Sequence, residues 1–285
     1  MEHLEVTIKQ VLLSATGPSA PPKLAAALDY ALFPGGARVR PQILLAVARA
    51  CGIDNPGLSL ASAAALELMH CASLVHDDLP AFDDADLRRG KPSVHRAFGE
   101  PVAVLVGDTL IVQAFEAVCD ARYDASGRQL ALARRLARYT GAPHGICAGQ
   151  GWESEITVDV GLYHAAKTGA LFMAAAEMGA LSAGGDPDAW TEMGARIGAA
   201  YQVADDLRDA LLGEAELGKP AGQDARHGRP SSVEEYGVQG SVTLLQDSLG
   251  AAISSIPACP GEAELAMLVR AQADRLVPEG LRART

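Results

Sequence analysis

Two groups of aspartates stand out as residues whose type and spacing indicate chemistry. They consist of Asp77, Asp78 and Asp83 in the first group, and Asp205, Asp206 and Asp209 in the second. Clustered carboxylates repel one another, so a folded protein keeps them where positive charge lies between them. Magnesium takes oxygen ligands, retains several waters and commonly bridges carboxylates to the phosphates of a substrate. The two groups therefore predict a site for a metal-bound diphosphate.

Positive side chains follow each group. Arg88, Arg89 and Lys91 come shortly after the first group, and Lys219 follows the second. An acidic run at the end of a helix is, taken alone, more often solvated surface than a functional site. Two such runs in apolar, Ala-rich surroundings, each with cations downstream, favour the functional interpretation.

Composition and periodicity favour an all-α fold as the framework for these groups. The chain is rich in alanine and only 5% aromatic, a mix typical of closely packed helices. No convincing run with the alternation of a strand appears. Helices are expected over residues 24–32, 41–50, 58–78, 101–123, 128–140, 144–155, 163–183 and 188–212, with one or two more between 233 and 281. Residues 213–232 are expected to form a loop.

Residues 1–285 are expected to form a single domain, a large helical bundle around a central cavity. Hydrophobic residues make up 49% of the chain, which is ample for a buried core, and no low-complexity linker marks a boundary. Pro80 is expected to end the helix just past Asp78, which lets Asp83 fold back toward Asp77. Two helix ends that carry aspartates would then face one shared cavity.

Charge and hydropathy exclude several classes of protein. The net charge of −11 argues against a nucleic-acid partner and against a general anionic-membrane surface. The apolar run from Leu58 to Val75 is interrupted by Glu67 and His70, which indicates a buried core helix and not an integral membrane protein. The acidic N-terminus predicts no secretory signal. Five scattered cysteines without a CxxC pair favour reduced thiols and a cytoplasmic location.

Read together, the motifs resemble the trans-isoprenyl diphosphate synthases, the polyprenyl synthetase family. The similarity covers roughly residues 24–232, and seven motifs in family order make it specific. They are Phe33-Pro34-Gly35-Gly36-Ala37-Arg38-Val39-Arg40-Pro41, His70 with Asp77-Asp78-x4-Asp83 and Arg88-Arg89-Gly90, Gln150, Lys167-Thr168-Gly169, Gln202, Asp205-Asp206-x-x-Asp209, and Gly218-Lys219-Pro220-x-Gly222-x-Asp224. The residues in and around these motifs look closest to those of geranylgeranyl diphosphate synthases from bacterial carotenoid and bacteriochlorophyll pathways.

The resemblance implies an isoprenoid synthase fold and a magnesium-dependent prenyltransferase. Such an enzyme condenses isopentenyl diphosphate head-to-tail with an allylic diphosphate (dimethylallyl, geranyl or farnesyl) and releases diphosphate. Three Mg²⁺ ions would join the allylic diphosphate to Asp77, Asp78, Asp83, Asp205, Asp206 and Asp209. Arg88, Lys167 and Lys219 would neutralise that diphosphate, and Thr168 and Gln202 would face the allylic cation. Isopentenyl diphosphate would bind Gly36, Arg38, Arg40, His70 and Arg89.

The family also implies a homodimer, for which the apolar helix over 101–115 is the expected interface. Ala37 departs from the family, because a lysine usually stands there; Arg38 is expected to compensate. Product length is expected to depend on Ala72, five residues before Asp77, together with Ser73 and Met69. Members that stop at C15 often have an aromatic at the first of these positions, so alanine favours a C20 product.

Four alternatives remain open. The chain could be a farnesyl diphosphate synthase that makes C15, or a non-catalytic regulatory subunit of a heteromeric synthase, for which Ala37 is the only feature. A class I terpene cyclase or a head-to-head synthase is disfavoured by the Gly35-Gly36 loop.

Overall fold

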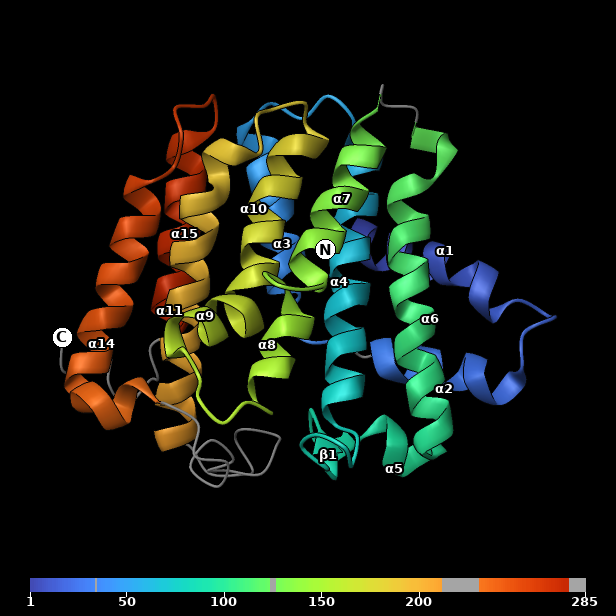
Figure 1. The fold of residues 1–285 in the computed structure, drawn as a ribbon. Coiled ribbons are helices and arrows are strands. Elements are labelled where there is room, and N and C mark those ends of the chain that lie inside the picture. The colour runs from blue at the N-terminus through green and yellow to red at the C-terminus, as the bar shows by residue number, and fades with distance from the viewer. Residues whose placement is uncertain (34, 124–126, 212–230, 277–285) are drawn as a thin grey trace.

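The computed structural model describes residues 1–33, 35–123, 127–211 and 231–276. A long central helix, α4 (Pro56–Asp77), organises this part of the chain (Figure 1). It packs against α1 (Glu2–Thr16), α3 (Val39–Ala50), α6 (Glu100–Cys119) and α10 (Ala170–Ser182). The predicted all-α class is confirmed.

Further helices complete the bundle. They are α2 (Pro22–Leu32), α5 (Val94–Phe98), α7 (Arg128–Thr140), α8 (Ile146–Trp152), α9 (Val160–His164), α11 (Thr191–Leu211), α14 (Ser232–Ser254) and α15 (Glu262–Leu276), with 3₁₀ turns η1 (Ala121–Tyr123) and η3 (Asp188–Trp190). A π-helical turn, η2 (Ala165–Gly169), interrupts the helix expected over 163–183. The sequence did not predict α1, or the antiparallel hairpin of β1 (Leu87–Arg88) and β2 (Lys91–Pro92).

The sequence of α4 explains both its start and its burial. The Asn55 side chain accepts a hydrogen bond from the Leu58 amide at 3.0 Å, and Pro56 occupies the first helical position. Among the described helices, α4 and α6 are long and apolar enough to cross a membrane, which is weak evidence by itself. The most apolar window of α4 is 78% buried inside the protein, as expected of a core helix, whereas that of α6 is 44% buried.

Two glycines let α11 approach the preceding helices backbone to backbone. A Cβ at Gly194 would lie 2.7 Å from the Cα of Met173 in α10, and a Cβ at Gly198 would lie 2.7 Å from the Cα of Gly169. Gly169 is the last residue of the π turn, which carries Lys167. This glycine contact therefore sets the distance between the helix of the second aspartate group and the segment that holds Lys167.

Replacing Gly194 with alanine should destabilise the protein. The added methyl group meets backbone atoms that can move only if the helices separate, and overpacking of this kind costs about 1–3 kcal/mol. The matched control is Gly250→Ala in α14, where a Cβ would meet nothing within 4 Å. That change should stabilise the protein by about 0.5–1 kcal/mol through helix propensity. Urea unfolding measures both, and equal stability of Gly194→Ala and wild type would contradict the contact.

Candidate active site

A cavity of about 830 Å³ opens at the C-terminal end of α4. Its walls come from α3, α4, α6, α8, η2 and α11, which lie far apart in the sequence. Fifteen sequence-predicted residues line it: Gly36, Arg38, Arg40, Met69, His70, Ala72, Ser73, Asp77, Asp83, Arg88, Arg89, Lys167, Thr168, Gln202 and Asp205. Three others, Asp78, Asp206 and Asp209, do not line it. Lys219, with its neighbours Gly218 and Pro220, lies outside the described residues.

The first aspartate group folds back on itself. Asp77 is the last residue of α4, and the chain turns through Pro80 immediately afterwards. The amide of Asp83 donates a hydrogen bond to the carbonyl oxygen of Asp77 at 3.0 Å. The return of Asp83 toward Asp77 is therefore confirmed.

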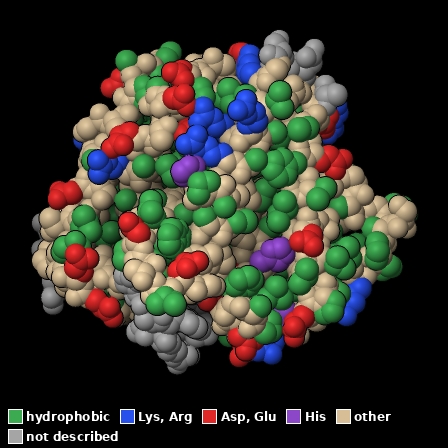
Figure 2. All heavy atoms as spheres, viewed as in Figure 1, with side chains coloured by type: hydrophobic (Ala, Val, Ile, Leu, Met, Phe, Trp, Pro, Cys, Tyr) green, Lys and Arg blue, Asp and Glu red, His purple; other side chains and the backbone are tan. Residues whose placement is uncertain are grey.

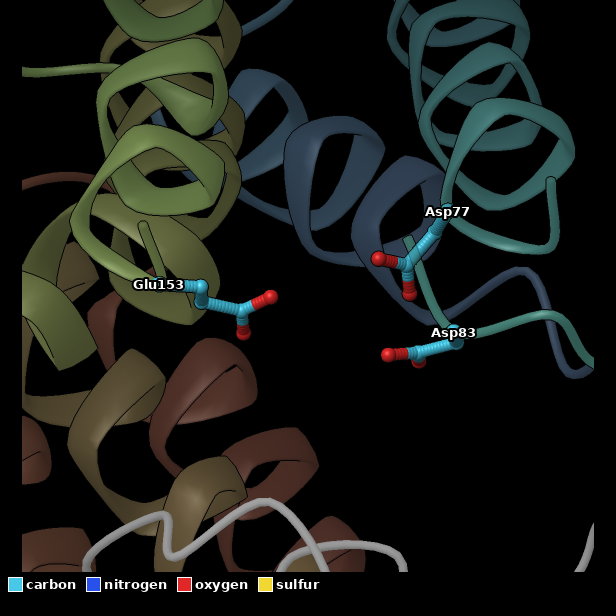
Figure 3. Close-up of side chains that lie close together, drawn as sticks. All are labelled: Asp77, Asp83 and Glu153. Carbon is cyan, nitrogen blue, oxygen red and sulfur yellow. The ribbon is translucent and has the colours of Figure 1, made fainter. Parts of the chain in front are cut away.

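A third carboxylate, Glu153, joins these two aspartates from the opposite wall. Oxygens of Asp77, Asp83 and Glu153 lie within 4.8 Å of one another, and Figure 3 shows the Glu153 side chain pointing across a gap at the other two. Sequence reasoning missed Glu153. The signal that could have identified it was its spacing from Gln150, since residues three apart on a helix lie close together. In the structure the Gln150 side-chain amide donates to Glu153 Oε2 at 2.9 Å.

Lys167 supplies the positive charge nearest this carboxylate cluster. Its Nζ donates to Glu153 Oε1, which also accepts from the Tyr163 hydroxyl at 2.7 Å. The same Nζ lies 3.7 Å from Asp77 Oδ1. Lys167 belongs to the π turn, and such single turns are frequent at functional sites because they redirect side chains. The structure thus brings Lys167 to the first aspartate group, which lies 90 residues away in sequence.

The chemistry of this cluster fits a divalent cation. Its donor set consists of carboxylate oxygens, which hard cations prefer. Burial raises the pKa of Asp77, although the positive charge of Lys167 opposes the shift. Asp77 Oδ1 is buried and has no hydrogen-bond partner among the described residues. A cation bound beside this oxygen would compensate for the desolvation of the ionised carboxylate.

Asp78 makes a different set of contacts from Asp77. Its buried carboxylate accepts from Arg88 Nε at 3.0 and 3.2 Å and also from Arg88 Nη2. The structure therefore holds Asp78 in an ion pair with Arg88, outside the lining of the cavity, and its role as a metal ligand stays a prediction. Because Arg88 belongs to β1, this pair ties the hairpin to the end of α4, and part of the cationic charge expected for substrate is engaged with Asp78.

Asp206 is also turned away from the cavity. The Thr168 hydroxyl donates to Gln202 Oε1 at 2.5 Å, and Gln202 Nε2 donates to Asp206 Oδ1 at 2.9 Å. The other Asp206 oxygen accepts from the amide of Ser232 at 2.7 Å, where α14 begins. A carboxylate at a helix N-terminus satisfies an amide that has no partner within the helix. Asp206 therefore joins α14 to the pair Thr168 and Gln202, while the exposed Asp205 lines the cavity.

Replacing Asp206 with alanine should destabilise the protein by about 1–2 kcal/mol, because the amide of Ser232 loses its acceptor. Asp206→Asn keeps an acceptor oxygen and should lose about half as much. The control is Asp205→Ala, which removes an exposed carboxylate one residue away and should change stability by about 0.5 kcal/mol or less. Chemical unfolding of the metal-free protein distinguishes them, and equal losses for Asp205→Ala and Asp206→Ala would exclude the capping role.

Two guanidinium groups occupy the space beside the consecutive glycines of the loop before α3. A Cβ at Gly35 would lie 2.1 Å from Cζ of Arg38, and a Cβ at Gly36 would lie 2.8 Å from Nη2 of Arg89. Larger residues at either position would displace an arginine. The structure thus explains the Gly-Gly pair by space for Arg38 and Arg89.

Arg40 and His70 form the cationic wall next to this loop. Arg40 Nη1 lies 3.4 Å from His70 Nε2, and its guanidinium lies 4.6 Å from the centre of the Phe172 ring. Burial lowers the pKa of His70 well below its usual value, and the charges of Arg40 and Arg89 add to the shift. His70 is therefore neutral at pH 7, and the positive charge of this wall comes from the arginines.

Arg38 is engaged with the protein on every side of its guanidinium. Nε donates to Glu5 Oε1 at 2.9 Å, Nη1 to Glu67 Oε1 at 2.6 Å, and Nη2 to the carbonyl oxygen of Leu32 at 2.9 Å. Its side chain is 1% exposed. The expectation that Arg38 takes over a substrate contact from the missing lysine at Ala37 does not agree with these contacts.

The residues expected to control product length lie on one stretch of α4. Met69 and Ala72 are buried at 0% and 1% exposure, Ser73 is partly buried, and all three line the cavity. Ile111 of α6 and Leu171 of α10 line the same cavity. This part of the cavity is apolar and suits a hydrocarbon chain.

Known proteins are similar to this chain in sequence and in fold. The family model described as Polyprenyl synthetase matches residues 21–263. The geranylgeranyl diphosphate synthase of Cereibacter sphaeroides is 59% identical over 283 residues, 99% of this chain and 98% of the relative. That of Rhodobacter capsulatus is 54% identical over 278 residues, 96% of both proteins. A Helicobacter pylori geranyltransferase, solved in complex with magnesium and isoprenyl diphosphate, matches with a TM-score of 0.83 at 26% identity over 96% of both chains.

Proposed function

The chain belongs to the polyprenyl synthetase family, and from this premise we propose that it condenses isopentenyl diphosphate with an allylic diphosphate to give geranylgeranyl diphosphate. The observation that carries the proposal is one cavity with a carboxylate cluster, an arginine-lined wall and an apolar wall. Both bacterial relatives described above are geranylgeranyl diphosphate synthases. These relatives favour the C20 product over the C15 alternative.

The allylic diphosphate is proposed to bind at the carboxylate end. Asp77, Asp83 and Asp205 would hold Mg²⁺, with Glu153 as a further oxygen donor. When bound, the metal supplies positive charge that stabilises the departing diphosphate. The protein's own contribution is Lys167, whose ammonium group lies among the carboxylates and is fixed by Glu153. A preorganised cation of this kind stabilises charge that develops on a leaving group.

The allylic cation is proposed to face Thr168 and Gln202. The hydroxyl hydrogen of Thr168 is directed at Gln202 Oε1, and the Gln202 amide is fixed in turn by Asp206. Both residues line the cavity, and their oxygens would serve as the negative ends of fixed dipoles. The apolar residues of α4, α6 and α10 keep water from the cation.

Isopentenyl diphosphate is proposed to bind the cationic wall of the cavity, at Arg40, Arg89 and the neutral His70. Guanidinium groups suit this task because they bind phosphate oxygens through two parallel donors. The diphosphate that leaves the allylic substrate is proposed to accept the proton released when the new double bond forms.

The chain is further proposed to act as a cytoplasmic homodimer. Hydrophobic side chains gather over the face that α6 exposes (Figure 2), and they include Val104, Leu105 and Val112 at 41%, 50% and 62% exposure. Apolar side chains at this exposure on one helix favour a surface that is covered in an assembly.

The test is an assay of the purified chain alone. Isopentenyl diphosphate, Mg²⁺ and one primer at a time (dimethylallyl, geranyl or farnesyl diphosphate) are supplied, and the dephosphorylated products are separated by chain length. A C20 product that disappears with a chelator and returns with Mg²⁺ supports the proposal. A main product of C15 would establish the farnesyl alternative, and absence of product unless a second synthase is added would establish the regulatory one.

A further inference from the structure

The first helix reaches the Gly-Gly loop although it lies before the residues that the family model matches. That match begins at residue 21, whereas α1 ends at Thr16. Glu5 of α1 accepts two hydrogen bonds from Arg38, from Nε at 2.9 Å and from Nη2 at 3.3 Å. A carboxylate that receives two donors from one guanidinium fixes the orientation of that guanidinium.

Arg38 and Glu67 are the buried centre of this contact. Their side chains are 1% and 2% exposed, and Nη1 of Arg38 donates to Glu67 Oε1 at 2.6 Å. Arg38 has a left-handed backbone with φ of 50°, and its guanidinium covers Gly35. A non-glycine residue holds this conformation where its surroundings enforce it. The bonds to Glu5 and Glu67 therefore set the shape of the loop between Gly35 and Arg40.

Glu67 interacts with two arginines at once. It is hydrogen-bonded to Arg38, and its negative charge also raises the pKa of Arg40, against the lowering by burial. Arg40 lines the cavity and is hydrogen-bonded to His70. If Glu67 were released from Arg38, it would be able to neutralise Arg40 and reduce the affinity of Arg40 for an anion.

We propose that Glu5 and Arg38 are positioning residues for the isopentenyl diphosphate subsite. They hold Glu67 and the loop so that Arg40 presents its charge to the substrate's diphosphate, an inference that rests on the proposed function. The uncharged Ala37 lines the same cavity and supplies no cation, so binding of the diphosphate depends more on the placement of Arg40. The N-terminal helix would thereby position the substrate site without lining the cavity.

Replacing Glu5 with glutamine should raise the KM for isopentenyl diphosphate about fivefold. The kcat and the KM for the allylic primer should change less than about twofold, since the carboxylate cluster and Lys167 are untouched. The matched control is Glu2→Gln, which removes an exposed carboxylate three residues earlier on the same helix and should leave all constants unchanged. Glu5 is 35% exposed, so this variant should fold.

A double-mutant cycle tests whether Glu5 affects isopentenyl diphosphate binding through its contact with Arg38. Arg38→Lys keeps the charge and loses the paired donors. On that background Glu5→Gln should raise the KM for isopentenyl diphosphate less than about twofold, because the paired contact is already gone. An undiminished effect would mean that Glu5 acts by another route and would overturn the proposal.

Calorimetric binding of isopentenyl diphosphate to the metal-free protein separates this inference from the proposed function. Weaker binding by Glu5→Gln than by Glu2→Gln supports the inference even if turnover is absent. A lower Tm with unchanged binding and KM, or equal rises in KM for both substrates, would show that the contact is structural only. A wild-type chain that binds no isopentenyl diphosphate would overturn both proposals.

Discussion

Replacing Asp77 with asparagine should lower kcat about a thousandfold. Asp77, the last residue of α4, is a member of the carboxylate cluster. Its Oδ1 is buried without a hydrogen-bond partner among the described residues. Asparagine has nearly the same shape but no charge, so it cannot balance a divalent cation. The neutral amide also loses the charge attraction to the ammonium of Lys167, which lies 3.7 Å from Asp77 Oδ1.

Steady-state kinetics at a series of Mg²⁺ concentrations measures this effect. The Mg²⁺ concentration for half-maximal rate should rise in Asp77→Asn, and the metal-free protein should remain as stable as wild type or become more stable, since a desolvated charge has been removed. The matched control is Asp86→Asn in the same segment, whose side chain is 74% exposed and paired with Arg96. A kcat for Asp77→Asn within about tenfold of the control would refute the role of Asp77.

Replacing Ala72 with phenylalanine should change the main product from C20 to C15. Ala72 is 1% exposed, lines the cavity and lies on α4 beside Met69, which is 0% exposed. An aromatic ring at this position has no space except in the cavity, where it would block the path of a chain longer than farnesyl. The kcat/KM for extension of farnesyl diphosphate should fall about a hundredfold, while that for geranyl diphosphate stays within about threefold.

Product analysis with each primer measures the shift. Ala72→Ser is the control, because serine adds a single oxygen and should leave C20 as the main product. A folded Ala72→Phe protein that still makes mainly C20 would show that the growing chain does not pass Ala72. The limit on length would then have to lie elsewhere on the cavity wall.

The residues that the sequence identified correctly are those marked by local pattern. Helical character in the sequence predicts α4, α7 and α11, and Pro80 predicts the turn that returns Asp83 to Asp77. These features depend on residues within about one or two turns of each other. The hairpin at Arg88 has strands of two residues each, too short for any alternation to show.

Partners of charged residues could not be predicted in the same way. The sequence marks Asp78 and Arg88 as charged but does not say that they bind each other. Glu153 follows α8, which packs against η2, and its approach to Asp77 depends on that tertiary packing. Glu5 was not considered, because α1 was not expected. The prediction of a single domain stays a prediction, and Lys219 lies outside the described residues.

The close contact of Gly198 with Gly169 limits how this protein can be redesigned. The π turn that carries Lys167 ends at Gly169, so any larger residue at position 198 would shift the cation that serves the leaving group. Substitutions that alter product length should therefore be tolerated on the α4 and α6 wall of the cavity, but not at the contact between Gly198 and Gly169. Selection for new products would be expected to leave both glycines in place while the opposite wall diverges.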